Sequence, residues 1–236
     1  MTSLPAGYRA AVIGASGTIG GAIADALRSD PRCGDLILFS RRPRAGERPI
    51  DLTDEASVAA AASHCGDLRL LFIASGALIL NDRPPEKALS QVDPQALADQ
   101  FALNAIGPLL ALKHFAPQTP RKERAMIAAL SARVGSIGDN RLGGWYGYRA
   151  AKTALNQYLR AASIELGRSR RELVVAALHP GTVESPLSKP FRPAGAADPG
   201  ILEPDQSAAR LLRVLDGLRA DQSGGFWDYA GAPIPW

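Results

Sequence analysis

The chain has 236 residues, of which 46% are hydrophobic, and a formal net charge of +4 at pH 7. A chain of this length can bury a sizeable core as one domain, so we expect a single domain over residues 1–236. No apolar run reaches the ~20 residues of a membrane span, and scattered arginines argue against nucleic-acid binding. Residues 1–7 lack the charged and apolar regions of a signal peptide, which predicts a cytoplasmic protein.

The first predicted unit is a strand, a glycine-rich turn and a helix. Residues 9–13 form a short apolar run typical of a buried strand, and residues 22–28 carry apolar side chains at helical spacing. This is the context that a dinucleotide-binding turn requires. Gly14 permits the tight turn, Gly17 lets the backbone approach a pyrophosphate, and Gly20 lets the helix pack on the strand.

Strands and helices then alternate along the rest of the chain. Repeated βα units predict a doubly wound parallel sheet of the Rossmann type with helices on both faces, and ligands bind beyond the strand C-termini in such sheets. Pro108 should kink the helix that contains it. The irregular stretch 184–204 is either a substrate lid or a plain surface loop. The predicted strands are 36–39, 68–73, 125–130 and 173–178, and the predicted helices are 56–63, 94–115 and 148–166.

The end of the second strand predicts the cofactor. An NAD enzyme usually places an acid there, against the ribose 2′-hydroxyl, but this strand runs into Ser40, Arg41 and Arg42. A guanidinium offers charge-assisted, bidentate hydrogen bonds to a phosphate, and the serine can add a hydroxyl. The run therefore favours NADP(H) over NAD(H), with Arg41 the first candidate and Arg42 the second; the alternative is ordinary surface arginines. Asp35, placed before the strand, cannot replace the missing acid.

Tyr148 and Lys152 are spaced i, i+4, which puts a phenol and an ammonium on one face of a helix. A free tyrosine has a pKa near ~10, and a cation held close lowers it. The pair is therefore a candidate proton donor and acceptor for a carbonyl or alcohol oxygen.

Metal chemistry is not indicated. Cys33 and Cys65 lack metal or redox spacing, and the three histidines, His64, His114 and His179, belong to no His/Cys/carboxylate cluster. We expect no metal site.

Over nearly its whole length the chain resembles the short-chain dehydrogenase/reductase family. Asn104 looks like the family's catalytic asparagine, and Tyr148 and Lys152 match its catalytic pair. The stretch 131–156 is most similar to small bacterial reductases related to sniffer-type carbonyl reductases and to the C-factor signalling protein. The glycine turn, the second strand and this resemblance together predict cofactor contacts at Gly14, Ser16, Gly17, Thr18, Ile19, Gly20, Ser40, Arg41, Arg42, Asp51, Leu52, Ala74, Ser75, Gly76, Tyr148, Lys152, Pro180, Gly181, Thr182 and Val183.

The chain departs from the family pattern at the catalytic serine. That serine usually lies three residues before a glycine, and counting back from Gly135 the position is Ala132. Ser131 and Ser136 are the nearest hydroxyls, and either could take over. Thr18 also replaces a second glycine, so the turn follows a Gly-x-x-Gly-x-x-Gly spacing.

The resemblance implies hydride transfer between NADP(H) and a carbonyl or alcohol. Tyr148 would exchange the proton, Lys152 would lower its pKa and hold the nicotinamide ribose, and Asn104 would hold a water that links Lys152 to solvent. Ser131 or Ser136 would bind the substrate oxygen. The alternative is a dinucleotide-binding regulatory or signalling protein with vestigial catalysis, which the C-factor resemblance and the missing serine favour.

The same resemblance predicts a homodimer or homotetramer. The helices that carry the asparagine and the tyrosine would form the interface, with Leu109, Leu155 and Leu159 pointing outward.

Overall fold

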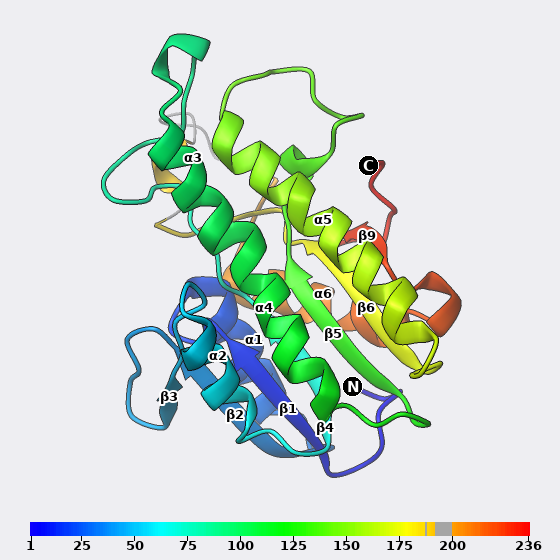
Figure 1. Cartoon of the computed structure of the whole chain (residues 1–236). Helices are drawn as coiled ribbons and strands as arrows, with labels where there is room; N and C mark the ends of the chain where they lie inside the picture. Colours follow the sequence, from blue (N-terminus) through cyan, green and yellow to red (C-terminus); the bar gives the residue numbers. More distant parts are fainter. Residues whose placement is uncertain (187, 192–199) are drawn as a thin grey trace.

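The computed structural model describes residues 1–186, 188–191 and 200–236. Its centre is a seven-stranded parallel sheet in the order β3-β2-β1-β4-β5-β6-β9 (Figure 1). The predicted doubly wound parallel sheet is confirmed. The strands are β1 (Tyr8–Ile13), β2 (Cys33–Ser40), β3 (Glu47–Pro49), β4 (Leu68–Ile73), β5 (Ala125–Leu130), β6 (Leu173–His179) and β9 (Gly225–Asp228).

Helices cover both faces of this sheet. In Figure 1 α2, α4 and α5 lie in front of the strands, and α1 and α6 lie behind them. Within the described residues, no helix is both long and apolar enough to cross a membrane. The helices are α1 (Thr18–Arg28), α2 (Glu55–Ala62), α3 (Pro94–Phe101), α4 (Gly107–Phe115), α5 (Tyr146–Gly167) and α6 (Pro204–Gly217), with short 3₁₀ turns at Leu89–Gln91, Ala116–Gln118, Arg133–Gly135, Lys189–Phe191 and Ala220–Gln222.

The strand side chains alternate between two hydrophobic cores. Ala11 and Ile13 of β1 join the core that contains α2, α4 and α5, whereas Ala10 and Val12 join the core under α1 and α6. Both sets are buried because the parallel strands are covered on both faces. This explains why β1, β4, β5 and β6 read as nearly continuous apolar runs.

Leu155 and Leu159 of α5 belong to the first of these cores and are each 1% exposed. The expectation that they point outward into a subunit interface is therefore wrong, because this face of α5 packs on the sheet. Leu109 is half-buried. The exposed large apolar side chains near these helices are Ile106, at 43%, and Ile164, at 52%.

The long helix expected over 94–115 is divided by a π-turn at Ala102–Ile106. The Gly107 N–H donates to the Ala102 carbonyl, five residues back. Pro108 follows at once, and a proline has no N–H for the carbonyl four residues before it and clashes with that carbonyl in a regular helix. The wider turn accommodates the proline, and it places Asn104 inside an irregular segment of a kind that often marks functional sites.

Elements beyond residue 180 were not predicted individually. A small parallel pair is formed by β7 (Thr182–Val183), just before the stretch 184–204, and β8 (Ile201–Leu202), within it. Helix α6 begins at the last residue of this stretch. Residues 187 and 192–199 of the predicted lid lie outside the described residues.

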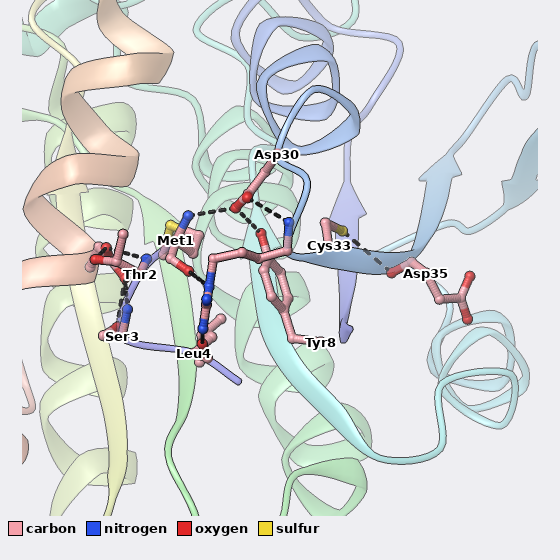
Figure 2. Close-up of polar contacts among 10 residues, drawn as sticks. Met1, Thr2, Ser3, Leu4, Tyr8, Asp30, Cys33 and Asp35 are labelled. Atoms are coloured by element: carbon pink, nitrogen blue, oxygen red, sulfur yellow. Dashed lines mark hydrogen bonds and ion pairs between the residues drawn. The ribbon is translucent and has the colours of Figure 1, made fainter. Parts of the chain in front are cut away.

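The N-terminal segment is fastened to two distant parts of the chain (Figure 2). The Met1 amine forms an ion pair with Asp30 at 2.5 Å. Thr2 and Ser3 both donate backbone N–H and hydroxyl bonds to the Asp216 carboxylate of α6, at 2.6–3.0 Å. Burial opposes ionisation of Asp216, but the bonds from Ser3 and Thr2 outweigh it and lower its pKa. We call this group of contacts the N-terminal clamp.

Candidate active site

A cavity of about 950 Å³ lies at the C-terminal ends of the parallel strands. It gathers residues that follow β1, β4, β5 and β6 together with the start of α5, where ligands bind in doubly wound sheets. The residues predicted from the sequence that line it are Ser16, Gly17, Thr18, Ile19, Ala74, Ser75, Gly76, Ser131, Tyr148, Lys152, Pro180, Gly181, Thr182 and Val183. The predicted residues that do not line it are Gly14, Gly20, Ser40, Arg41, Arg42, Asp51, Leu52, Asn104 and Ser136.

The glycine turn brings backbone from three segments together. Gly14 has φ +87°, and a Cβ there would lie 3.0 Å from Ala74 C and Ser75 N. A Cβ on Gly20 would lie 2.1 Å from the Gly14 carbonyl oxygen, so only glycine lets α1 approach the turn this closely. Gly17 is the N-cap of α1 and gives no side-chain cap, which leaves the first N–H groups of the helix open to a ligand at the cavity.

Two side chains at and just after the end of β2 contact this turn. The buried Ser40 hydroxyl accepts a bond from the Ser16 N–H at 3.0 Å, and Arg44 donates to the Ser16 carbonyl at 3.1 Å. Arg41 and Arg42 are exposed. Arg44 was not predicted to contact the turn; it belongs to the same basic run but does not line the cavity.

Asp51 and Asp35, the two acids near the second strand, both have partners within the protein. Thr53 donates its hydroxyl and N–H to Asp51, and these bonds, with a smaller contribution from the Arg41 charge, lower the Asp51 pKa. Asp35 lies within β2 rather than before it, and forms an ion pair with Arg9 at 2.7 Å. It is at the beginning of the strand, so it is remote from the strand end where an acid would meet a ribose.

Tyr148 and Lys152 are both buried in the cavity wall. The lysine Nζ lies 5.7 Å from the centroid of the tyrosine ring and donates to the Leu130 carbonyl at 2.9 Å. Burial raises the pKa of Tyr148 to about 12 and lowers that of Lys152 to about 8. The expected lowering of the tyrosine pKa is not found, because burial of the phenol raises it.

Asn104 is fully buried behind the cavity wall. Its Oδ1 accepts from the Ala77 N–H at 3.1 Å, and its Nδ2 donates to the Ala77 carbonyl and to Gln100 Oε1. A Cβ on Gly76, which has φ +154°, would lie 2.9 Å from Asn104 Oδ1 and 3.3 Å from Lys152 Nζ. This glycine therefore lets the amide oxygen and the ammonium converge, and Gln100, which sequence reasoning missed, fixes the orientation of the amide.

The two candidate serines are placed differently. Ser131 lines the cavity, but its hydroxyl donates to Asn156 Oδ1 at 2.6 Å. Ser136 is buried outside the cavity lining, and its hydroxyl accepts from the Asp139 N–H at 3.1 Å. Ala132 itself lines the cavity. The structure thus brings the Ser131 hydroxyl to the cavity, but its proton is already donated to Asn156.

His179 also lines the cavity, at the end of β6. Burial lowers its pKa to about 4, with the Arg133 charge adding to this effect and Asp228 opposing it, so the imidazole is neutral at pH 7. Its Nδ1 is buried and has no hydrogen-bond partner in the described part of the chain.

Several further lining residues were not predicted. Arg133, Arg141, Leu142, Trp145 and Arg149 come from the segment between β5 and α5 and from its junction with the helix. For Trp145 and Arg149, their position close to Tyr148 in the sequence was the available signal. Ser185, Pro186 and Ser188, which follow β7 in the stretch predicted to be a lid or a surface loop, also line the cavity.

Comparison with known proteins identifies the family. A model of the short chain dehydrogenase family matches residues 9–195. The C-signal protein of Myxococcus xanthus is 37% identical over 150 residues, which cover 63% of this chain and 84% of that protein. The 1-hydroxy-2-glutathionyl-2-methyl-3-butene dehydrogenase of Rhodococcus sp. (strain AD45) is 29% identical over 194 residues, which cover 80% of each protein.

Solved structures show the same fold. The NADPH-bound carbonyl reductase from chicken fatty liver superposes with a TM-score of 0.82 at 23% identity, covering 99% of this chain and 96% of that one. Carbonyl reductase Sniffer of D. melanogaster superposes with a TM-score of 0.79 at 23% identity, covering 98% and 100%. The predicted resemblance to C-factor-like and sniffer-type proteins is confirmed. The chain belongs to the short-chain dehydrogenase family of oxidoreductases.

Proposed function

We propose that this protein transfers a hydride between NADP(H) and a carbonyl or alcohol substrate, with Tyr148 as the proton donor or acceptor. One observation carries the proposal. Tyr148 and Lys152 are buried side by side in the wall of a cavity that is also lined by the glycine turn of α1. A proton-exchanging pair and a phosphate-binding turn in one cavity suit a dinucleotide and a small second substrate.

The residues around the cavity fit such a cofactor. The open N-terminus of α1 offers N–H groups to phosphate oxygens, and the approach is open because Gly17 has no side chain. The Ser75 hydroxyl is buried without a hydrogen-bond partner in the described residues, which suits a polar ligand group. Arg44 at the Ser16 carbonyl, with its neighbours Arg41 and Arg42, supports a site for a 2′-phosphate. When bound, the nicotinamide supplies or accepts the hydride.

The side chains of the protein would manage the proton. With its pKa raised to about 12, Tyr148 keeps its hydroxyl proton at neutral pH and can give it to the oxygen of a carbonyl that is being reduced. Lys152 is oriented by the Leu130 carbonyl, beside the tyrosine ring. Asn104 and Lys152 converge on Gly76, and we assign them the return of a proton from solvent through a held water.

A second function is favoured by a specific observation. Ala132 lines the cavity where a hydrogen-bond donor is expected, and the neighbouring Ser131 hydroxyl is donated to Asn156. A missing donor to a developing oxyanion typically lowers kcat by about 10²–10³. The chain could therefore bind a dinucleotide as a regulatory protein with vestigial catalysis.

The deciding experiment follows NADPH absorbance with a panel of aldehydes, ketones and quinones. We expect turnover that Tyr148→Phe lowers by at least ~100-fold, since general acid catalysis contributes about 10²–10⁴. Tyr146→Phe, two residues earlier on the same helix, is the matched control and should stay within a few-fold of wild type. Tight NADPH binding without turnover on any substrate would favour the regulatory function instead.

We also propose a homodimer or homotetramer, in which the exposed Ile106 and Ile164 replace the buried leucines as candidate contacts. Light scattering at micromolar concentration tests this proposal, and a monomer mass would refute it.

A further inference from the structure

The helix that carries Tyr148 begins without a cap from its own N-cap residue. Trp145 occupies the N-cap position with φ +53° in the left-handed region, and its side chain makes no cap hydrogen bond. The first N–H groups of a helix have no partner within the helix and need an acceptor when they are buried. The start of α5 therefore depends on another segment of the chain.

Glu86 supplies two acceptors at this position. Its carbonyl accepts from the Trp145 N–H at 2.5 Å, and its carboxylate Oε2 accepts from the Gly147 N–H at 3.2 Å. The contact is close, because a Cβ on Gly147 would lie 3.1 Å from Glu86 Oε1. A negative charge at a helix N-terminus is also favoured by the helix dipole.

Glu86 is only 8% exposed, and no lysine, arginine or histidine nitrogen of the described residues forms an ion pair with it. A buried carboxylate without a cation is unfavourable unless hydrogen bonds compensate for it. The Gly147 N–H is the hydrogen bond that the structure gives the carboxylate. The Glu86 carboxylate therefore stabilises the first turn of α5.

The segment that leads to Glu86 is held by the other candidate catalytic region. Asn104 bonds both the N–H and the carbonyl of Ala77, and Gln100 donates to the Leu78 carbonyl at 3.0 Å. The segment 77–86 thus connects the π-turn that contains Asn104 with the first turn of α5. This short segment therefore helps to set the positions of both Asn104 and the first turn of α5.

We propose that Glu86 is a positioning residue for the reaction, which holds the first turn of α5 and thereby places the Tyr148 hydroxyl. The inference rests on the proposed oxidoreductase function. Tyr148 directly follows Gly147, so a shift of this turn passes to the phenol. A misplacement of a reacting group by about 1 Å can lower a rate ~100-fold.

The test compares Glu86→Gln with Glu86→Met. Glutamine keeps an oxygen acceptor in the same shape, whereas methionine keeps the length and removes the acceptor. At saturating NADPH and carbonyl substrate we expect Glu86→Gln to stay within ~3-fold of wild-type kcat, and Glu86→Met to fall by about 10–100-fold. The Kd for NADPH should be unchanged in both, because the glycine turn is untouched. Lys87→Ala, an exposed neighbour, is the control.

Thermal unfolding of each variant separates positioning from stability. A purely structural role would lower the unfolding temperature of Glu86→Met while the folded enzyme keeps its kcat, and that result would overturn the proposal. Equal losses in Glu86→Gln and Glu86→Met would overturn it too. If Glu86→Met does not fold, Gly147→Ala takes its place, since its Cβ would lie 3.1 Å from both Glu86 Oε1 and Leu97 Cδ2 and would displace the first turn of α5, and an unchanged kcat would then contradict the inference. Absence of turnover in the wild-type protein would instead refute the proposed function.

Discussion

Replacing Gly20 by alanine sets two opposing effects against each other in the first turn of α1. Alanine is favoured over glycine inside a helix by about 1 kcal/mol, so propensity alone predicts a more stable protein. The added Cβ, however, would lie 2.1 Å from the Gly14 carbonyl oxygen, 2.8 Å from Gly14 C and 3.2 Å from Ala74 Cβ.

The steric effect should win. Ordinary contact begins at 3.4 Å, so the Cβ is 1.3 Å (3.4 minus 2.1) too close to an oxygen that belongs to the backbone of the turn. Overpacking of this kind typically lowers stability by about 1–3 kcal/mol, and we expect the upper end because no flexible side chain can yield. After subtracting the gain in propensity, the free energy of unfolding should fall by about 2 kcal/mol. Displacement of the turn should also weaken NADPH binding by at least ~10-fold, or about 1.4 kcal/mol.

Urea unfolding followed by tryptophan fluorescence gives the first quantity, and a fluorescence titration with NADPH gives the second. Gly167→Ala is the matched control, because it is also helical and a Cβ there would meet nothing within 4 Å. It should be neutral or stabilising by up to about 1 kcal/mol. A Gly20→Ala protein that is as stable as wild type and binds NADPH equally well would refute the reasoning.

Three further outcomes follow from the charges described above. Asp216→Asn should lower the free energy of unfolding by about 2 kcal/mol at pH 7. The pKa of Asp216 is lowered in the folded state, so its stabilisation is fully present above the ordinary value near ~3.9 and is lost as the pH falls through the folded-state pKa. In urea unfolding, the difference in stability between wild type and Asp216→Asn should therefore be smaller at pH 3 than at pH 7. Burial lowers the pKa of Lys152 to about 8, so carbonyl reduction should slow as the pH rises through 8 and the ammonium loses its proton; a rate that stays flat to pH 10 would exclude this role. Alanine at Arg41 or Arg42 should weaken NADPH binding by ~10-fold or more while leaving NADH binding unchanged, in line with one charged hydrogen bond, and equal losses for both nucleotides would count against a 2′-phosphate site.

The predictable part of the fold was encoded in local patterns. The run 9–13 was read as a buried strand because nearly all of its side chains are apolar, and the sheet buries them on both faces. The close contact at Gly20 was predicted from the glycine spacing alone, since each glycine has a distinct conformational or steric reason within one short turn. Such signals depend only on neighbours in the sequence.

The remaining features depend on contacts between distant residues. The direction in which Leu155 and Leu159 point is decided by the sheet beneath α5, and the sequence marks them only as apolar. The Glu86 carboxylate meets Gly147 across 61 positions, so no spacing rule connects them. The raised pKa of Tyr148 comes from burial, and the spacing of Tyr148 and Lys152 in the sequence does not predict how deeply they are buried.

The N-terminal clamp has a consequence for how the protein opens. Chain ends usually fray, and their amide protons exchange with solvent within a short time. Here the amides of Thr2 and Ser3 are bonded to Asp216, which lies on α6 near the other end of the sequence. These bonds join the start of the chain to a helix more than 200 positions away, so the amides of Thr2 and Ser3 should exchange more slowly than those of a free chain end. Replacing Asp216 should therefore speed exchange at both residues.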